Sequence, residues 1–235
     1  MTSAMTTPDQ SFARVSPALA RYERDVLLDG VWKRPGLSPR DRSIVTLSAL
    51  ITRGQTASLP FYTAQALDHG VKPAEVSEIL THLAFYAGWC QAVTATPSID
   101  SVFAERGITA DQLPSASPQL LPIDQAAEDR RAKLVSESVG PASSGLVEDT
   151  GAVLFRDLWL RPDLAPRDRS VVTVAALITS GQFSQITFHL GKAMDNGLTA
   201  TEASELVSHL AWYAGWPSAF SAVPVVKSVF ESRAK

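Results

Sequence analysis

Apolar residues recur along this chain at the spacing of helices, and no stretch alternates apolar and polar residues as a half-buried strand does. Ser38, Pro39 and Asp41 have the order of a helix start, with an N-cap serine, a proline at the first helical position and an early acid. The run that follows, residues 44–51, is apolar on nearly every face. This pattern predicts a helix at the centre of the molecule.

The rest of the unit also reads as helices. A second helix is predicted from about residue 57 to 69, because Gly70 is a suitable C-terminal glycine. Pro73 opens a third helix, and a fourth contains Val102 and Phe103. We therefore predict an all-α fold of short packed helices.

The chain contains the same unit twice. Trp32 and Trp159 stand 127 positions apart, and this offset aligns the two halves without a gap; 38 of the 75 positions from Trp32 to Arg106 are identical in the second half. Such a match indicates a duplication. We assign a first repeat to residues 1–110, a linker rich in proline and serine to 111–122, and a second repeat to 123–235.

Charge and composition exclude several classes of function. The net charge is −3 with both signs interspersed, which argues against a nucleic-acid or anionic-membrane partner. The apolar runs are too short to span a bilayer, and residues 1–15 lack the apolar stretch of a signal peptide. Cys90 is the single cysteine, so an intrachain disulfide and a CxxC motif are both excluded. We expect a cytoplasmic protein.

Several matched segments follow the order of a known family. In the second repeat they are Trp-x-Arg-Pro-x-Leu-x-Pro-Arg-x-Arg-Ser from Trp159, Gly181-Gln182, Phe188-His189 and Tyr213-Ala-Gly-Trp216. On these residues the chain resembles the carboxymuconolactone decarboxylase family, over about 75 residues of each repeat. The resemblance implies the all-helical carboxymuconolactone decarboxylase/alkylhydroperoxidase D fold. It also implies decarboxylation without metal or organic cofactor, and a ring of six units, which a tandem chain would form as a homotrimer.

The peroxidase branch of that fold uses a CxxC pair shortly before the histidine of the second helix. Here Gln182 and Gln185 stand at those offsets from His189, so thiol peroxidase chemistry is excluded. In the decarboxylase branch the same two positions usually carry Arg and Glu. The first repeat departs further, because Tyr62 replaces the histidine itself. These changes favour a relative that acts on a different substrate.

The residue types that remain suit the loss of CO2 from a small unsaturated acid. Arginine can pair with a carboxylate, tyrosine or glutamine can donate a hydrogen bond to an enolate oxygen, and histidine can deliver a proton. The second repeat supplies the catalytic candidates, which are His189, Arg169, Tyr213 and His209. The substrate-binding candidates are Gln185, Gln182, Trp216, Arg42, Tyr62, His82 and Tyr86. No metal ligand set is predicted, and no partner except a small-molecule substrate and further copies of the chain.

Other interpretations of these residues stay open. One arginine of each Arg-x-Arg pair can serve in structural ion pairs, Glu78 and His82 can be an ordinary helix pair, and Cys90 can be a buried small apolar residue. The protein can also be a cofactor-free isomerase, cyclase or hydrolase, or a ring-forming relative without activity. Because His189 faces Tyr62 in the alignment, we expect two unequal sites, of which the one with His189 works.

Overall fold

The computed structural model describes residues 11–234, and it contains helices and no strand within that range. The first repeat has four main helices, α3 (Pro39–Thr52), α4 (Leu59–Asp68), α5 (Pro73–Tyr86) and α6 (Trp89–Glu105). The second has the equivalent α9 (Pro166–Ser180), α10 (Ile186–Asp195), α11 (Ala200–Tyr213) and α12 (Trp216–Arg233). The prediction of an all-α fold with two tandem units is therefore confirmed.

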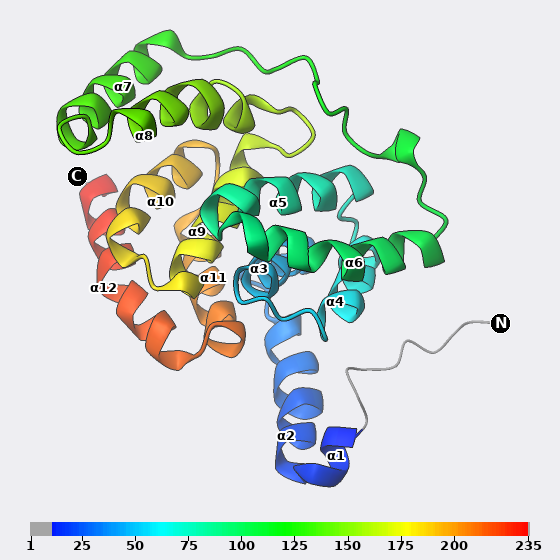
Figure 1. Ribbon diagram of the computed structural model, residues 1–235. Helices are drawn as coiled ribbons and strands as arrows, with labels where there is room; N and C mark the ends of the chain where they lie inside the picture. The colour runs from blue at the N-terminus through cyan, green and yellow to red at the C-terminus, as the bar shows by residue number, and fades with distance from the viewer. Residues whose placement is uncertain (1–10, 235) are drawn as a thin grey trace.

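Short helices precede each set of four. In the first repeat these are α1 (Ser11–Val15), α2 (Pro17–Arg21), the π-helical η1 (Tyr22–Leu28) and the 3-10 turn η2 (Val31–Lys33). In the second they are α7 (Gln125–Val139), α8 (Ser144–Asp149), η4 (Thr150–Phe155) and η5 (Leu158–Leu160), and further 3-10 turns occur at η3 (Ala110–Gln112) and η6 (Phe183–Gln185). Figure 1 shows α1 and α2 projecting from the body, whereas α7 and α8 lie beside α10.

The helix starts follow the local signals in the sequence. The side chain of Ser38 accepts a hydrogen bond of 3.0 Å from the backbone N–H of Asp41, which caps α3. Thr199 and Glu202 form a reciprocal capping box at the start of α11. Gly181 ends α9 in the left-handed conformation, with φ of 76°.

Helices α3 and α9 form the centre of the molecule and pack against each other. Both are buried on all faces from their first acid onward, as the apolar run of the sequence predicts. Helix α5 of the first repeat packs on α9 of the second, and α11 of the second packs on α3 of the first. The third helix of each repeat thus lies against the central helix of the other repeat, which determines where the functional side chains meet.

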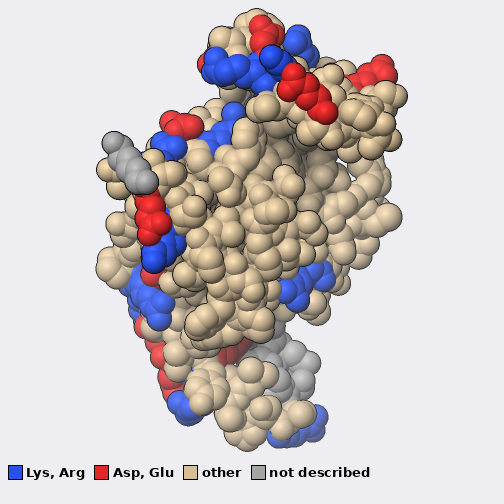
Figure 2. Space-filling model, turned by 90° about the vertical axis from the view of Figure 1, so that its left-hand side faces the viewer, with Lys and Arg blue, Asp and Glu red and all other residues tan. Residues whose placement is uncertain are grey.

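The surface is unevenly charged. On the side that carries α10 and α12, Figure 2 shows a broad area without Lys, Arg, Asp or Glu, with charged side chains above it over α7 and α8 and along the edges. Exposed apolar side chains on α12 include Trp216, Phe220 and Val223. Within residues 11–234 we find no helix whose length and hydropathy would allow it to span a membrane.

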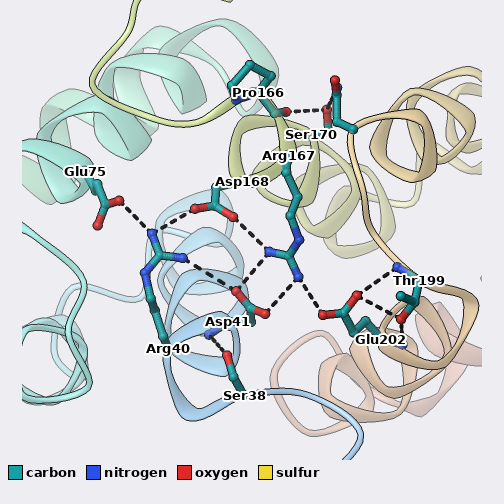
Figure 3. Close-up of polar contacts among 11 residues, drawn as sticks. Ser38, Arg40, Asp41, Glu75, Pro166, Arg167, Asp168, Ser170, Thr199 and Glu202 are labelled. Atoms are coloured by element: carbon teal, nitrogen blue, oxygen red, sulfur yellow. Dashed lines mark hydrogen bonds and ion pairs between the residues drawn. The ribbon is translucent and has the colours of Figure 1, made fainter.

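A symmetric ion-pair network joins the two repeats where α3 and α9 begin (Figure 3). Arg40 of α3 reaches Asp168 of α9 at 2.8 Å, and Arg167 of α9 reaches Asp41 of α3 at 2.9 Å. Each arginine also binds an acid in the first turn of the third helix of its own repeat, Glu75 at 2.6 Å and Glu202 at 2.9 Å. The first arginine of each Arg-x-Arg pair is thus structural, and it fixes the two repeats to one another.

Candidate active site

The histidine of each third helix is buried against the central helix of the other repeat. His82 of α5 is fully buried, with its Nδ1 3.4 Å from Nη1 of Arg169 and its Nε2 2.7 Å from Oγ1 of Thr173, both on α9. Because an arginine can only donate, Nδ1 is the acceptor and the Nε2–H donates to the threonine. Burial, and then the charge of Arg169, lowers the pKa of His82 well below its usual value. The ring is neutral and held at both nitrogens.

Hydrogen bonds within the protein occupy most of the Arg169 guanidinium, so few of its N–H groups can reach a substrate. Its side chain has no exposed surface, and its Nη2 donates to Glu78 and to the backbone oxygen of Arg161, each at 2.9 Å. The Arg161 guanidinium binds the same Glu78 carboxylate at 2.8 Å. The carboxylate that Arg169 holds therefore belongs to the protein. Glu78 pairs with these arginines and not with His82, so it is not an ordinary helix partner of that histidine.

Three aromatic side chains gather above this pair. The indole Nε1–H of Trp159 donates a hydrogen bond of 2.8 Å to the hydroxyl of Tyr86. His189 of α10 stacks on Trp159, with ring centroids 5.9 Å apart and planes inclined by 15°. The edge of Tyr86 meets the same imidazole, with 5.3 Å between centroids. The cluster around His189 thus takes Tyr86 and His82 from the first repeat and the remainder from the second.

His189 differs from His82 in its hydrogen bonding. Only 7% of its surface is exposed, and its Nδ1 is buried without a hydrogen-bond partner among the described residues. Burial, followed by the nearby charge of Lys192, lowers the pKa of His189 to about 4. The imidazole is therefore neutral at neutral pH. An unpartnered buried polar atom is costly, so the Nδ1 of His189 is free to take a hydrogen bond from a group that enters the site.

A cavity of about 480 Å³ lies next to this cluster, between α7 and α10. Neither His189 nor Tyr86 lines the cavity; Trp159 lines it and also stacks on His189, so this ring connects the cavity to the cluster. The other apolar walls are Ile123, Leu134, Phe155, Leu160 and Phe188, and Lys192 of α10 contributes a cation. A volume of this size suits a small organic molecule.

The equivalent cluster in the other half is filled by its own side chains. Trp32 donates a hydrogen bond of 2.8 Å to the hydroxyl of Tyr213, which donates in turn to the hydroxyl of Tyr62 at 3.2 Å. His209 is held by Arg42 at 3.2 Å and by Thr46 at 2.8 Å. Burial, and then the charge of Arg42, lowers the pKa of His209 to about 3. Tyr62 thus completes a hydrogen-bonded chain at the position where His189 leaves a nitrogen unpartnered.

The comparisons with known proteins agree with this architecture. The Carboxymuconolactone decarboxylase family matches residues 17–100 and 146–228, one segment in each repeat and together more than half of the chain. The chain belongs to this family. Its family membership and tandem organisation confirm the resemblance found in the sequence.

Two curated relatives of the family carry the names of decarboxylases. The 4-carboxymuconolactone decarboxylase of Acinetobacter baylyi is 36% identical over 75 residues, which are 32% of this chain and 56% of that protein. The nitrosuccinic acid decarboxylase of Metarhizium robertsii is 35% identical over 65 residues, which are 28% of this chain and 46% of that protein. The chain thus spans about half the length of the curated relatives that it matches. These names support a decarboxylase-like enzyme.

The structure corrects how this family member combines its candidates. His209 and Tyr213 were expected beside Arg169 and His189, but they lie in the cluster with Arg42 and Tyr62. The grouping by repeat is wrong because the third helices pack across to the other repeat. His82 and Tyr86, expected in the other half, are the neighbours of Arg169 and His189.

Four other expectations meet a different environment. The side chains of Gln182 and Gln185 are exposed in the turn before α10. Trp216 is half exposed on α12, where it lines a separate groove together with Trp212 and Phe220. Cys90, interpreted as a buried residue, is exposed in the first turn of α6.

Sequence reasoning missed several residues of the site. Trp159 and Trp32 were noted only as markers of the repeat, although each donates the hydrogen bond that orders its cluster. Thr173 and Thr46 are identical across the repeats, and this match is the signal that could have found them. Lys192 gave no such signal, because its counterpart is Gln65. Within residues 11–234, no three His, Cys, Asp or Glu side chains are placed to hold a metal ion.

Proposed function

We propose that this chain is a decarboxylase that acts on a small carboxylated lactone or related unsaturated acid, with His189 as the proton-transferring residue. The observation that carries the proposal is the buried imidazole of His189, whose Nδ1 has no partner among the described residues, beside a cavity of about 480 Å³. The decarboxylase names of two relatives support the reaction class.

The reaction needs a place for charge and a source of a proton. As the bond to the carboxyl group breaks, CO2 leaves and the electron pair moves through the unsaturated system onto a carbonyl oxygen. A proton then adds to carbon and the oxyanion returns to a carbonyl. In our proposal the imidazole of His189, once protonated, gives its proton to that carbon. The net change is loss of CO2 and gain of one proton.

Tyr86 is suited to stabilise the developing oxyanion. Its oxygen accepts from Trp159, while we find no acceptor for its own hydroxyl proton in the described part of the chain. Burial raises the pKa of Tyr86 above its usual value, so the phenol stays protonated and able to donate. A fixed donor of this kind stabilises charge that appears only during the reaction.

We assign the remaining candidates to positioning. Arg169 and Glu78 hold each other and His82, which supports the helix that carries Tyr86. The second cluster keeps the same arrangement around Arg42 and His209, and Tyr62 fills its open position. We propose that the second cluster stabilises the fold and does not turn over substrate. A homotrimer and a cytoplasmic location remain proposals as well.

The test is incubation of the purified protein with 4-carboxymuconolactone, and separately with nitrosuccinate, while released CO2 and the product are measured. His189→Asn should lower the rate by about 10²–10⁴ and leave the fold intact, because it removes a general acid–base group. Tyr62→Phe is the matched control at the equivalent position and should cost much less. Isomerised or hydrolysed product without CO2 would favour the alternative enzyme classes, and greater damage from Tyr62→Phe would reverse the assignment of the working site.

A further inference from the structure

We propose that Lys192 binds a carboxylate that the substrate keeps throughout the reaction, and that this contact places the substrate against His189. The inference rests on the proposed function and adds a specificity residue to it. Lys192 lies three residues after His189 on α10, so both side chains leave the same side of the helix. It lines the cavity between α7 and α10.

The position of Lys192 is set by the aromatic stack. Its Nζ lies 5.2 Å from the centroid of the Trp159 ring. That ring is nearly parallel to His189, with 5.9 Å between centroids, and to Phe155, with 6.0 Å between centroids. A cation over an indole is attracted to the ring yet keeps its N–H donors free. Lys192 therefore combines a fixed location with unused donors.

The acidic groups that line the cavity are already paired or capped. Glu128 of α7 binds Arg131 at 2.7 Å and Arg156 at 3.4 Å, and Asp195 of α10 binds Arg233 at 2.6 Å. Asp124 caps α7 by accepting from the backbone N–H of Ala127 at 3.0 Å. The acids of the cavity thus each have a donor.

Two cations of the cavity lack such a partner. Across residues 11–234 we find no ion pair for Lys192 of α10 or for Arg130 of α7, although both line the cavity. Arg130 is exposed to solvent, whereas Lys192 is half-buried beside Trp159. An uncompensated, partly desolvated ammonium attracts an anion, and a carboxylate is the anion that the reaction class supplies.

The carboxylate at Lys192 must be the one that stays. If Lys192 paired with the carboxylate that leaves as CO2, it would stabilise the negative charge of that group in the ground state. In the transition state this charge moves away from the carboxylate, so the pairing would slow the reaction. A second carboxylate keeps its charge, so its binding energy can orient the substrate without such a penalty. The preferred substrates are therefore diacids.

Binding at Lys192 also changes His189. The charge of Lys192 acts with burial to hold the imidazole neutral. A carboxylate bound to Lys192 offsets that charge and adds a negative one near the ring, so the proton affinity of His189 rises when substrate binds. The imidazole then takes up the proton that the reaction consumes.

The experiment uses succinate as a probe, because a saturated diacid can bind without reacting. Calorimetric titrations at neutral pH, in two buffers of different ionisation enthalpy, give both affinity and proton uptake. The wild-type protein should bind succinate with proton uptake, and Lys192→Met should weaken binding about tenfold or more, which is about 1.4 kcal/mol. Lys192→Arg should restore most of the affinity, and His189→Asn should bind without proton uptake.

Lys227→Met on α12 is the matched control, since this exposed lysine pairs with Glu231 at 3.7 Å and does not line the cavity. Its binding of succinate should equal that of the wild type. Equal affinity in Lys192→Met and wild type, or absence of succinate binding to the wild type at millimolar concentration, would overturn the inference. Binding that depends on Lys192 together with no CO2 from 4-carboxymuconolactone would refute the proposed reaction and uphold the carboxylate site.

Discussion

Trp159 donates a hydrogen bond of 2.8 Å from its indole nitrogen to the hydroxyl of Tyr86, a residue of the other repeat. Trp32 of the first repeat donates the equivalent hydrogen bond, also of 2.8 Å, to the hydroxyl of Tyr213 in the second repeat. Each repeat therefore completes the cluster of the other. A single repeat cannot build this site alone, and the duplicated chain holds both halves in one molecule.

This relationship predicts unequal effects from two matched substitutions. Tyr86→Phe and Tyr213→Phe each remove the acceptor of one tryptophan N–H, so each should lower the free energy of unfolding by about 1–3 kcal/mol, as measured in urea. Only Tyr86→Phe should also lower the rate of decarboxylation, because only that cluster contains His189. Equal loss of activity in both variants would contradict the assignment of a single working site.

The buried histidines predict a loss of stability in weak acid. Burial lowers the pKa of His189 to about 4 and that of His209 to about 3, from an ordinary value of 6.5, and it lowers the pKa of His82 as well. The unfolded chain thus binds protons at these sites below about pH 6.5 where the folded chain does not. Stability is fully present above that pH and falls as the pH drops, by about 1.4 kcal/mol per pH unit for each histidine.

Urea denaturation between neutral pH and about pH 5 measures this slope, because carboxylates titrate mainly below that range. Replacing His189 with asparagine should reduce the slope by roughly one third, since one of three such groups is lost. A slope unchanged by this substitution would mean that His189 is already protonated in the folded protein.

Most of the fold could be predicted from the sequence, because its determinants are local. The apolar run of α3, the cap at Ser38 and the capping box of Thr199 act within a few residues, and the structure shows each where it is expected. The duplication could also be predicted, because a constant offset of 127 residues aligns the two halves. Helix α7 could not be predicted from the repeat, because the first repeat has no counterpart of it among the described residues.

The composition of the site could be predicted only in part. The sequence named residues of both clusters, yet their grouping depends on which helices pack across the repeats, and sequence spacing carries no record of that packing. Tyr86 of α5 and His189 of α10 meet because α5 packs on α9, although the linker separates these helices in the sequence. Lys192 was missed because its counterpart in the first repeat is Gln65, and because the cavity that it lines is walled by α7, which lies outside the matched segments of the two repeats.

Cys90 should have no part in the chemistry. It is exposed on α6, opposite Pro217 in the alignment, and no second thiol exists in the chain to resolve a sulfenate. Cys90→Ala should leave decarboxylation unchanged, and neither protein should consume peroxide in a coupled assay. Peroxide turnover by the wild type that the variant lacks would show that this exposed thiol is reactive.

The exposed apolar residues predict association of the chain with itself. Phe220 on α12 is 71% exposed, and Trp89 on α6 is 67% exposed, near the equivalent end of the other repeat. Large apolar side chains grouped on a surface mark an interface, and Figure 2 shows a broad area without charged side chains on the face that carries α12. Three chains would bring six repeats into a ring. We therefore expect sedimentation analysis to give a trimer.

Phe220→Glu tests this expectation, because it would place a carboxylate in a contact that excludes water. The variant should dissociate toward monomers while its helical circular dichroism stays unchanged, since the residue contributes little to the core of its own chain. Val15→Glu is a suitable control, because Val15 is 78% exposed on α1, away from both apolar groups. A wild-type protein that sediments as a monomer, or a trimer that tolerates Phe220→Glu as well as Val15→Glu, would show that α12 is not the interface. Dissociation only in Phe220→Glu would identify the surface through which the repeats of different chains meet, because the two substitutions add the same charge.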